Sequence, residues 1–60
     1  MNVGDTVFVK LTPKGKKIAG WFRGVVQQLN GTVAKVQAWD GKEFQNVLSM
    51  VRDLKTEKPD

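Results

Sequence analysis

Few side chains in this sequence could carry acid–base or nucleophilic chemistry. Its 60 residues include six carboxylates but no His, Cys or Tyr. Histidine is the usual general base near neutral pH, and Cys and Tyr are common catalytic alternatives. Asp40 and Glu43 are three residues apart beside a predicted turn, a common structural use of acidic residues. Because ordinary zinc ligands are also missing, we expect no enzymatic activity, no catalytic residue, no metal and no cofactor.

Basic side chains are more promising. The chain has ten Lys and Arg residues against six Asp and Glu residues, for a net charge of +4. No acidic residue lies between Thr6 and Trp39. The basic residues of that span are Lys10, Lys14, Lys16, Lys17, Arg23 and Lys35. Such a group either only keeps a small protein in solution or binds phosphates, whose neutralisation releases counterions.

Two tryptophans, Trp21 and Trp39, are the third notable feature. In so small a chain, at least one Trp is expected to be largely buried. If both are exposed, they form either a platform on which nucleic-acid bases stack or an interface for a protein partner or a second copy. Arg23 could read guanine edges, and Gln27 or Gln37 could read adenine edges.

Strands are expected to position these side chains. Short runs rich in β-branched and aromatic residues alternate with turn signals, a pattern typical of a small all-β barrel or sandwich. The predicted strands cover residues 6–11, 19–29, 32–39 and 42–45, followed by one helical turn over 46–50 and a last short strand over 51–54. A short helix over 47–54 is the alternative for the C-terminal part.

The turn at Asn30-Gly31 decides which side chains face outward. A two-residue loop would pair Leu29 with Thr32, whereas a three-residue loop would place Gly31 in the left-handed conformation. A slip of one residue exchanges the two faces of a strand. The three-residue loop gives the better core, because Arg23 then points outward.

The preferred register has consequences for both faces. On the inner face, it groups Phe22, Gly24 and Val26 with Ala34, Val36 and Ala38. On the outer face, it places Trp21 opposite Trp39, Arg23 opposite Gln37 and Val25 opposite Lys35. A second three-residue turn, Trp39-Asp40-Gly41, would set Val36 opposite Phe44 and commit Phe44 to the core.

The length of the chain bounds its organisation. Sixty residues form one small domain, which buries only roughly 60% of its unfolded surface. No apolar run approaches the roughly 18–20 residues that span a bilayer, and the N-terminus does not resemble a signal peptide. We therefore expect a cytoplasmic protein without a membrane partner. Residues 1–55 are expected to form the domain, and residues 56–60 a disordered tail.

Taken together, these motifs resemble the SH3-like barrels of the Tudor, KOW and retroviral-integrase C-terminal type. In Tudor domains, an aromatic pair followed by Arg and a small residue lies on the second strand, and a one-turn 3₁₀ helix precedes the last strand. The matching segments here are Trp21-Phe22-Arg23-Gly24, Val36, Asp40-Gly41 and Val51-Arg52-Asp53-Leu54. The resemblance covers residues 3–55 and implies an all-β, five-stranded SH3-like barrel with a 3₁₀ turn before the last strand.

The sequence departs from a Tudor cage for methylated Lys or Arg. Such a cage needs three or four aromatic residues with an acidic or amide partner, whereas only Phe8, Trp21 and Trp39 are expected outside the core. A net charge of +4 would also repel a cationic tail. We therefore expect a DNA- or RNA-binding barrel with limited sequence preference; the alternative is a protein-interaction or self-associating module that uses the same Trp face. The predicted nucleic-acid-binding residues are Lys10, Lys14, Lys16, Lys17, Trp21, Arg23, Lys35, Gln37 and Trp39.

Overall fold

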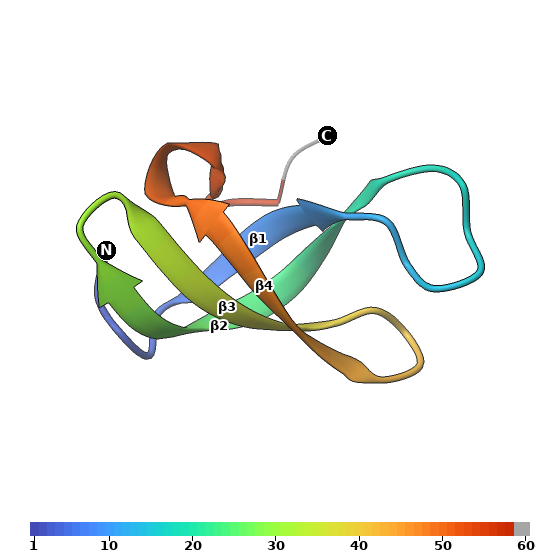
Figure 1. The fold of residues 1–60 in the computed structure, drawn as a ribbon, viewed down its shortest axis with the longest axis horizontal. Coiled ribbons are helices and arrows are strands. Elements are labelled where there is room, and N and C mark those ends of the chain that lie inside the picture. The colour runs from blue at the N-terminus through green and yellow to red at the C-terminus, as the bar shows by residue number, and fades with distance from the viewer. Residues whose placement is uncertain (59–60) are drawn as a thin grey trace.

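A computed structural model describes residues 1–58 as a four-stranded antiparallel sheet followed by one helical turn (Figure 1). The elements are β1 (Thr6–Leu11), β2 (Gly20–Asn30), β3 (Val33–Trp39), β4 (Phe44–Met50) and the 3₁₀ helix η1 (Val51–Asp53). Each strand pairs with the next along the chain, so the sheet order is β1-β2-β3-β4. The all-β class predicted from the sequence is confirmed, and the described residues contain no α-helix.

One face of the sheet supplies the core. Side chains alternate between the two faces of a strand, so every second residue of β1 and β3 points inward. The buried apolar residues are Val7, Val9, Leu11, Val26, Ala34, Val36, Ala38 and Leu54. Phe22, Leu29, Val47 and Val51 are partly buried and pack against them. The predicted inner faces of β2 and β3 are therefore correct, and Arg23 does point outward.

The predicted pairing of β2 with β3 is wrong, although the faces are right. Asn30 pairs with Val33, so the loop is Gly31-Thr32, and neither predicted loop is present. A register shift between Val26 and Gln28 then moves the pairing, and Val26 lies opposite Val36. Together, the loop and this irregularity move the β3 partner of each β2 residue by an even number of positions from the predicted one. Because side chains alternate between the two faces of a strand, an even shift leaves each side chain on its predicted face. Gly31 has the left-handed conformation expected of it, with φ of 62°.

The turn between β3 and β4 also differs from the prediction, because it is longer. Trp39 pairs with Phe44, and Val36 pairs with Val47 rather than with Phe44. The connection therefore spans residues 40–43, with Gly41 at φ of 98°. Phe44 is placed on the outer face and is 65% exposed, so its predicted place in the core is wrong.

The predicted C-terminal elements need a larger correction. Residues 46–50 belong to β4 instead of a helical turn, and the helical turn occupies Val51–Asp53, where the last strand was expected. The alternative helix over 47–54 is wrong as well. Within β4 the inward and outward positions alternate regularly. The alternation is hidden in the sequence because Leu48 and Met50, which point outward, are as apolar as Val47, which points inward.

The segment after η1 returns to the free edge of β1. Lys55 forms an isolated bridge with Phe8, in which each backbone N–H donates to the other residue's carbonyl at 2.7 and 3.0 Å. The fifth strand predicted over residues 51–54 is therefore not formed, and within residues 1–58 the C-terminal segment pairs with β1 only through this isolated bridge. The disordered tail expected over residues 56–60 stays a prediction, and its last two residues, Pro59 and Asp60, lie outside the described part of the chain.

Candidate functional site

On the outer face of the sheet, a groove that the partly buried Phe22 also lines is bordered by four further aromatic side chains, one from each strand. They are Phe8 of β1, Trp21 of β2, Trp39 of β3 and Phe44 of β4. The groove has a volume of about 500 Å³. Its lining consists of Thr6, Phe8, Trp21, Phe22, Arg23, Gly24, Val25, Trp39, Phe44 and Lys58. These described lining residues include two basic side chains and no acidic one.

Strand register fixes the walls of this groove. Because Trp39 and Phe44 are paired across β3 and β4, their ring centroids lie 4.9 Å apart, with the planes tilted by 58°. Tilted and offset arrangements are favourable for aromatic pairs. On the β1–β2 side, the guanidinium carbon of Arg23 lies 5.9 Å from the ring centroid of its cross-strand neighbour Phe8. The groove thus combines aromatic surfaces with a cation held over one of the rings.

Asp40 holds the turn that places Phe44 beside Trp39. Its carboxylate accepts hydrogen bonds from the backbone N–H groups of Lys42 and Glu43, both at 2.8 Å, and from the side-chain amide of Gln45. The hydrogen bond from Glu43, followed by that from Lys42, lowers the pKa of Asp40 below its usual value. Burial of this side chain, which is 8% exposed, acts in the opposite direction and is outweighed.

This turn is expected to respond to acid. A carboxylate whose pKa is depressed in the folded state stabilises the fold above its unfolded pKa, and this contribution is lost as the pH falls through the lower folded pKa. As the pH is lowered below about 4, we expect the free energy of unfolding of the wild type to decrease. The decrease should be smaller in Asp40→Asn. Urea unfolding at pH 7 and pH 3 measures both. Equal losses in the two proteins would show that Asp40 does not contribute.

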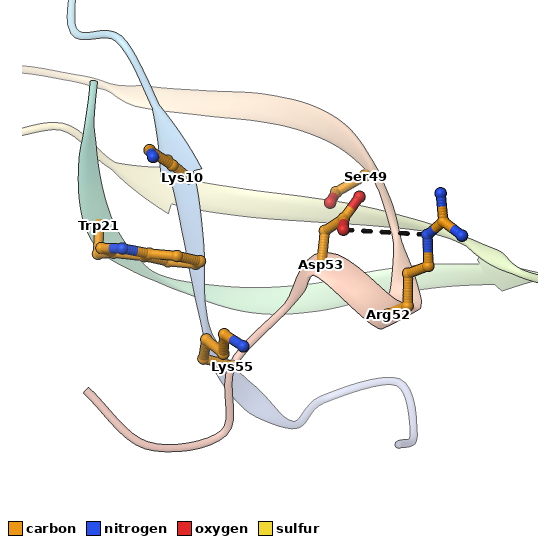
Figure 2. A pocket seen from close by; sticks show the side chains of 6 residues that line it. All are labelled: Lys10, Trp21, Ser49, Arg52, Asp53 and Lys55. Carbon is orange, nitrogen blue, oxygen red and sulfur yellow. Dashed lines mark ion pairs between the residues drawn. The ribbon is translucent and has the colours of Figure 1, made fainter. Parts of the chain in front are cut away.

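Trp21 also borders a second hollow, which lies between β1 and the C-terminal segment (Figure 2). This hollow has a volume of about 480 Å³, and its other lining residues are Lys10, Ser49, Arg52, Asp53 and Lys55. The Arg52 Nε atom is 4.0 Å from the Asp53 carboxylate, and both side chains are largely exposed. With three basic residues against one acidic residue, the hollow has a net positive charge. Trp21 thus has an aromatic groove on one side and a basic hollow on the other.

The structure brings together only part of the predicted site. Trp21, Arg23 and Trp39 line the groove, and Lys10 lines the basic hollow. The predicted contact of Trp21 with Trp39 is wrong in its register: Gly24 pairs with Ala38, so the same ladder continued by one residue would set Arg23 beside Trp39. Gln37 and Lys35 are cross-strand neighbours of Val25 and Gln28, rather than of Arg23 and Val25 as predicted.

The remaining predicted lysines lie elsewhere. Lys14 lines a separate hollow beside the β3–β4 turn, together with Gly15, Asp40, Lys42 and Glu43. Lys16 and Lys17 are exposed in the loop between β1 and β2 and, like Lys35 and Gln37 on the outer face of β3, do not line the groove.

Sequence reasoning missed several residues around Trp21. The sequence predicts Phe44 in the core, and the predicted binding residues do not include Arg52, Lys55 or Lys58. A longer turn after Trp39 would have revealed Phe44, because Asp40 and Gly41 are compatible with loops of three or four residues. No local signal marks Lys55, whose position depends on a bridge to the other end of the chain.

The fold and the groove define a small antiparallel all-β protein with an aromatic, basic outer face. No protein-family model, curated protein or solved structure matches the chain. In the described part of the chain, no helix has the length and apolar character needed to cross a membrane. Residues 1–58 also contain no group of three or more His, Cys, Asp or Glu side chains that could hold a metal ion.

Proposed function

We propose that this protein is a small SH3-like barrel that binds single-stranded nucleic acid with limited sequence preference. Support for the barrel comes from the Lys55–Phe8 bridge, which adds the C-terminal segment to the free edge of β1 and places it where a fifth strand would lie. The observation that carries the function is the groove itself, which Arg23 lines together with the four outer-face aromatic side chains and Phe22. Such binding requires no enzymatic activity and no cofactor.

The charge of the groove favours an anionic ligand. Arg23 and Lys58 line it, and Lys10, Arg52 and Lys55 lie on the other side of Trp21. Bases that stack on the aromatic rings would therefore have basic side chains within reach of their phosphates. Stacking contributes about 1–3 kcal/mol per base and tolerates any base, which explains a limited sequence preference. A duplex keeps its bases stacked on one another, so we expect the single strand to bind more tightly.

A titration of labelled oligonucleotides tests this function. Single-stranded and double-stranded probes are added at two salt concentrations, while tryptophan fluorescence is recorded. We expect quenching by the single strand and a slope of log K against log salt of about −2 to −3, as three to four phosphate contacts would give. Absence of binding up to roughly 100 μM at low salt would contradict the proposal, since non-specific binders reach 10⁻⁴–10⁻⁶ M.

A protein-interaction module remains the second candidate, and the exposure of Trp39 and Phe44 favours it, because such residues are enriched at protein interfaces. The presence of Phe44 beside Trp39 also supplies the fourth aromatic residue that a Tudor-like cage would need. However, Arg23 already lies over Phe8, and the described lining has no carboxylate to attract a methylated cation. A salt-independent interaction with a peptide, without oligonucleotide binding, would favour this candidate.

A further inference from the structure

The edge of β4 that faces away from β3 is not covered by any other described segment. At the opposite end of the sheet order, β1 is partly covered by its bridge to Lys55. Strand β4 pairs only with β3, and no backbone hydrogen bond joins Phe44–Met50 to another described segment. The Met50 carbonyl accepts a hydrogen bond from the adjacent Ser49 hydroxyl at 3.2 Å. The edge therefore offers backbone groups to another strand.

Two hydrogen bonds at the ends of the β3–β4 ladder show which groups point outward. The Val51 N–H donates to the Thr32 carbonyl at 2.8 Å, and the Asp40 N–H donates to the Glu43 carbonyl at 3.2 Å. Hydrogen-bonded pairs alternate along an antiparallel ladder, so Gln45, Val47 and Ser49 direct their backbone groups to β3. The backbone groups that point away from β3, toward the free edge, belong to Phe44, Asn46, Leu48 and Met50.

The composition of β4 does not protect this edge. Edge strands usually carry a charge, a proline or a bulge that prevents pairing with another chain. Strands β1, β2 and β3 each contain a basic residue, whereas β4 has no charge and no proline, and its pairing with β3 is regular throughout. Its outward side chains are also apolar at Leu48, which is 74% exposed, and at Met50, which is 38% exposed.

We propose that β4 pairs antiparallel with β4 of a second copy around a two-fold axis at Val47. Phe44 then lies opposite Met50 of the second copy, and Asn46 lies opposite Leu48. This register pairs all the outward backbone groups with one another. It also brings the Met50 thioether to the Phe44 ring, a favourable contact.

Charges at the ends of β4 fit a second copy in this orientation. Lys42 and Glu43 precede the strand, and Arg52 and Asp53 follow it. Antiparallel pairing brings the start of one strand to the end of the other, so each end of the paired strands gathers Lys42 and Glu43 of one copy with Arg52 and Asp53 of the second copy, a set of charges that sums to zero. The two-fold axis is perpendicular to the sheet, so both aromatic grooves open on the same side of the dimer. The pairing does not depend on the proposed function.

Sedimentation of the wild-type protein from about 10 μM to about 1 mM tests the dimer. We expect the apparent mass to rise from that of one chain toward that of two. Leu48→Lys should stay monomeric at all these concentrations. Ile18→Lys is the matched control, because it adds the same charge at an aliphatic side chain that is 83% exposed in the β1–β2 loop. A wild type that stays monomeric, or a Leu48→Lys protein that dimerises equally, would overturn the proposal.

Two further measurements test whether the edge of β4 itself joins the two copies. Asn46→Pro removes one outward N–H and leaves the hydrogen bonds to β3 in place, as proline permits at an edge; it should weaken dimerisation while circular dichroism remains that of the folded sheet. Amide hydrogen exchange locates the contact. With about 90% of chains paired, the amides of Phe44, Asn46, Leu48 and Met50 should exchange about tenfold more slowly than in the monomer. A dimer without this protection would use the aromatic face and disprove the edge pairing.

Discussion

Replacement of Gly24 by alanine should lower the free energy of unfolding by about 1–3 kcal/mol, as overpacked core positions do. A Cβ atom at Gly24 would lie 2.5 Å from Cγ1 of Val36 and 2.8 Å from the backbone oxygen of Gln37. A backbone atom of β3 cannot rotate away as a side chain can, so β2 and β3 would have to move apart. Domains of this length are stabilised by about 3–9 kcal/mol in total, which makes the expected loss a large fraction.

Gly20→Ala provides a matched control in the same strand. Its Cβ would approach Phe22 no closer than 3.4 Å, an ordinary contact. Alanine also restricts the unfolded chain, so this change is expected to be neutral or to stabilise by about 0.4–1 kcal/mol. Urea unfolding of the three proteins measures the difference. If Gly24→Ala unfolds at the same urea concentration as the wild type, the close packing of β2 on β3 is not as described.

Phe44→Ala is expected to weaken single-strand binding by about 1–3 kcal/mol, or about 5- to 150-fold, if one base stacks on this ring. Because Phe44 is largely exposed but pairs with Trp39, its truncation should lower the free energy of unfolding by about 0.5–1.5 kcal/mol, which leaves the protein folded. The affinity is measured by fluorescence titration at low micromolar protein, where the monomer should predominate. Circular dichroism verifies that the fold is retained.

Two comparisons make this result specific. Phe44→Leu keeps an apolar side chain but removes the ring, so nucleic-acid binding should still fall, whereas a partner that needs only an apolar surface would tolerate the change. Ile18→Ala truncates an exposed aliphatic side chain that does not line the groove and should leave the affinity unchanged. Unaltered binding by Phe44→Ala would remove the groove from the proposed nucleic-acid contact.

Alternation of apolar and polar residues was sufficient to predict the faces of β1 and β3, and the face of β2 followed from keeping Arg23 out of the core. Val7 and Val9 point inward, as do Ala34, Val36 and Ala38. These positions can be recognised in the sequence because each alternates with a more polar or larger neighbour. Strand β4 lacks this contrast: Phe44, Leu48 and Met50 on its outer face are as apolar as Val47 on its inner face. Periodicity therefore could not distinguish an extended strand from a helical turn.

The groove was harder to predict than the strands because it depends on turn lengths. Trp39 and Arg23 were correctly placed on the outer face, but their neighbours depend on the register shift after Val26 and on the connection through Asp40. Neither feature has a unique local sequence signal: Asn-Gly and Asp-Gly pairs suit loops of several lengths. The aromatic cluster follows only once both registers are known.

The pairing of Phe8 with Lys55 links β1 to a segment near the other end of the chain. Contacts between residues so distant in sequence form late, because the entropy of closing a long loop opposes them. We infer that the meander of β1 to β4 assembles before the C-terminal segment is added. A ribosome-bound chain would then need to expose residue 55 before this edge could close, and until that moment β1 would have an unpaired edge in the nascent protein.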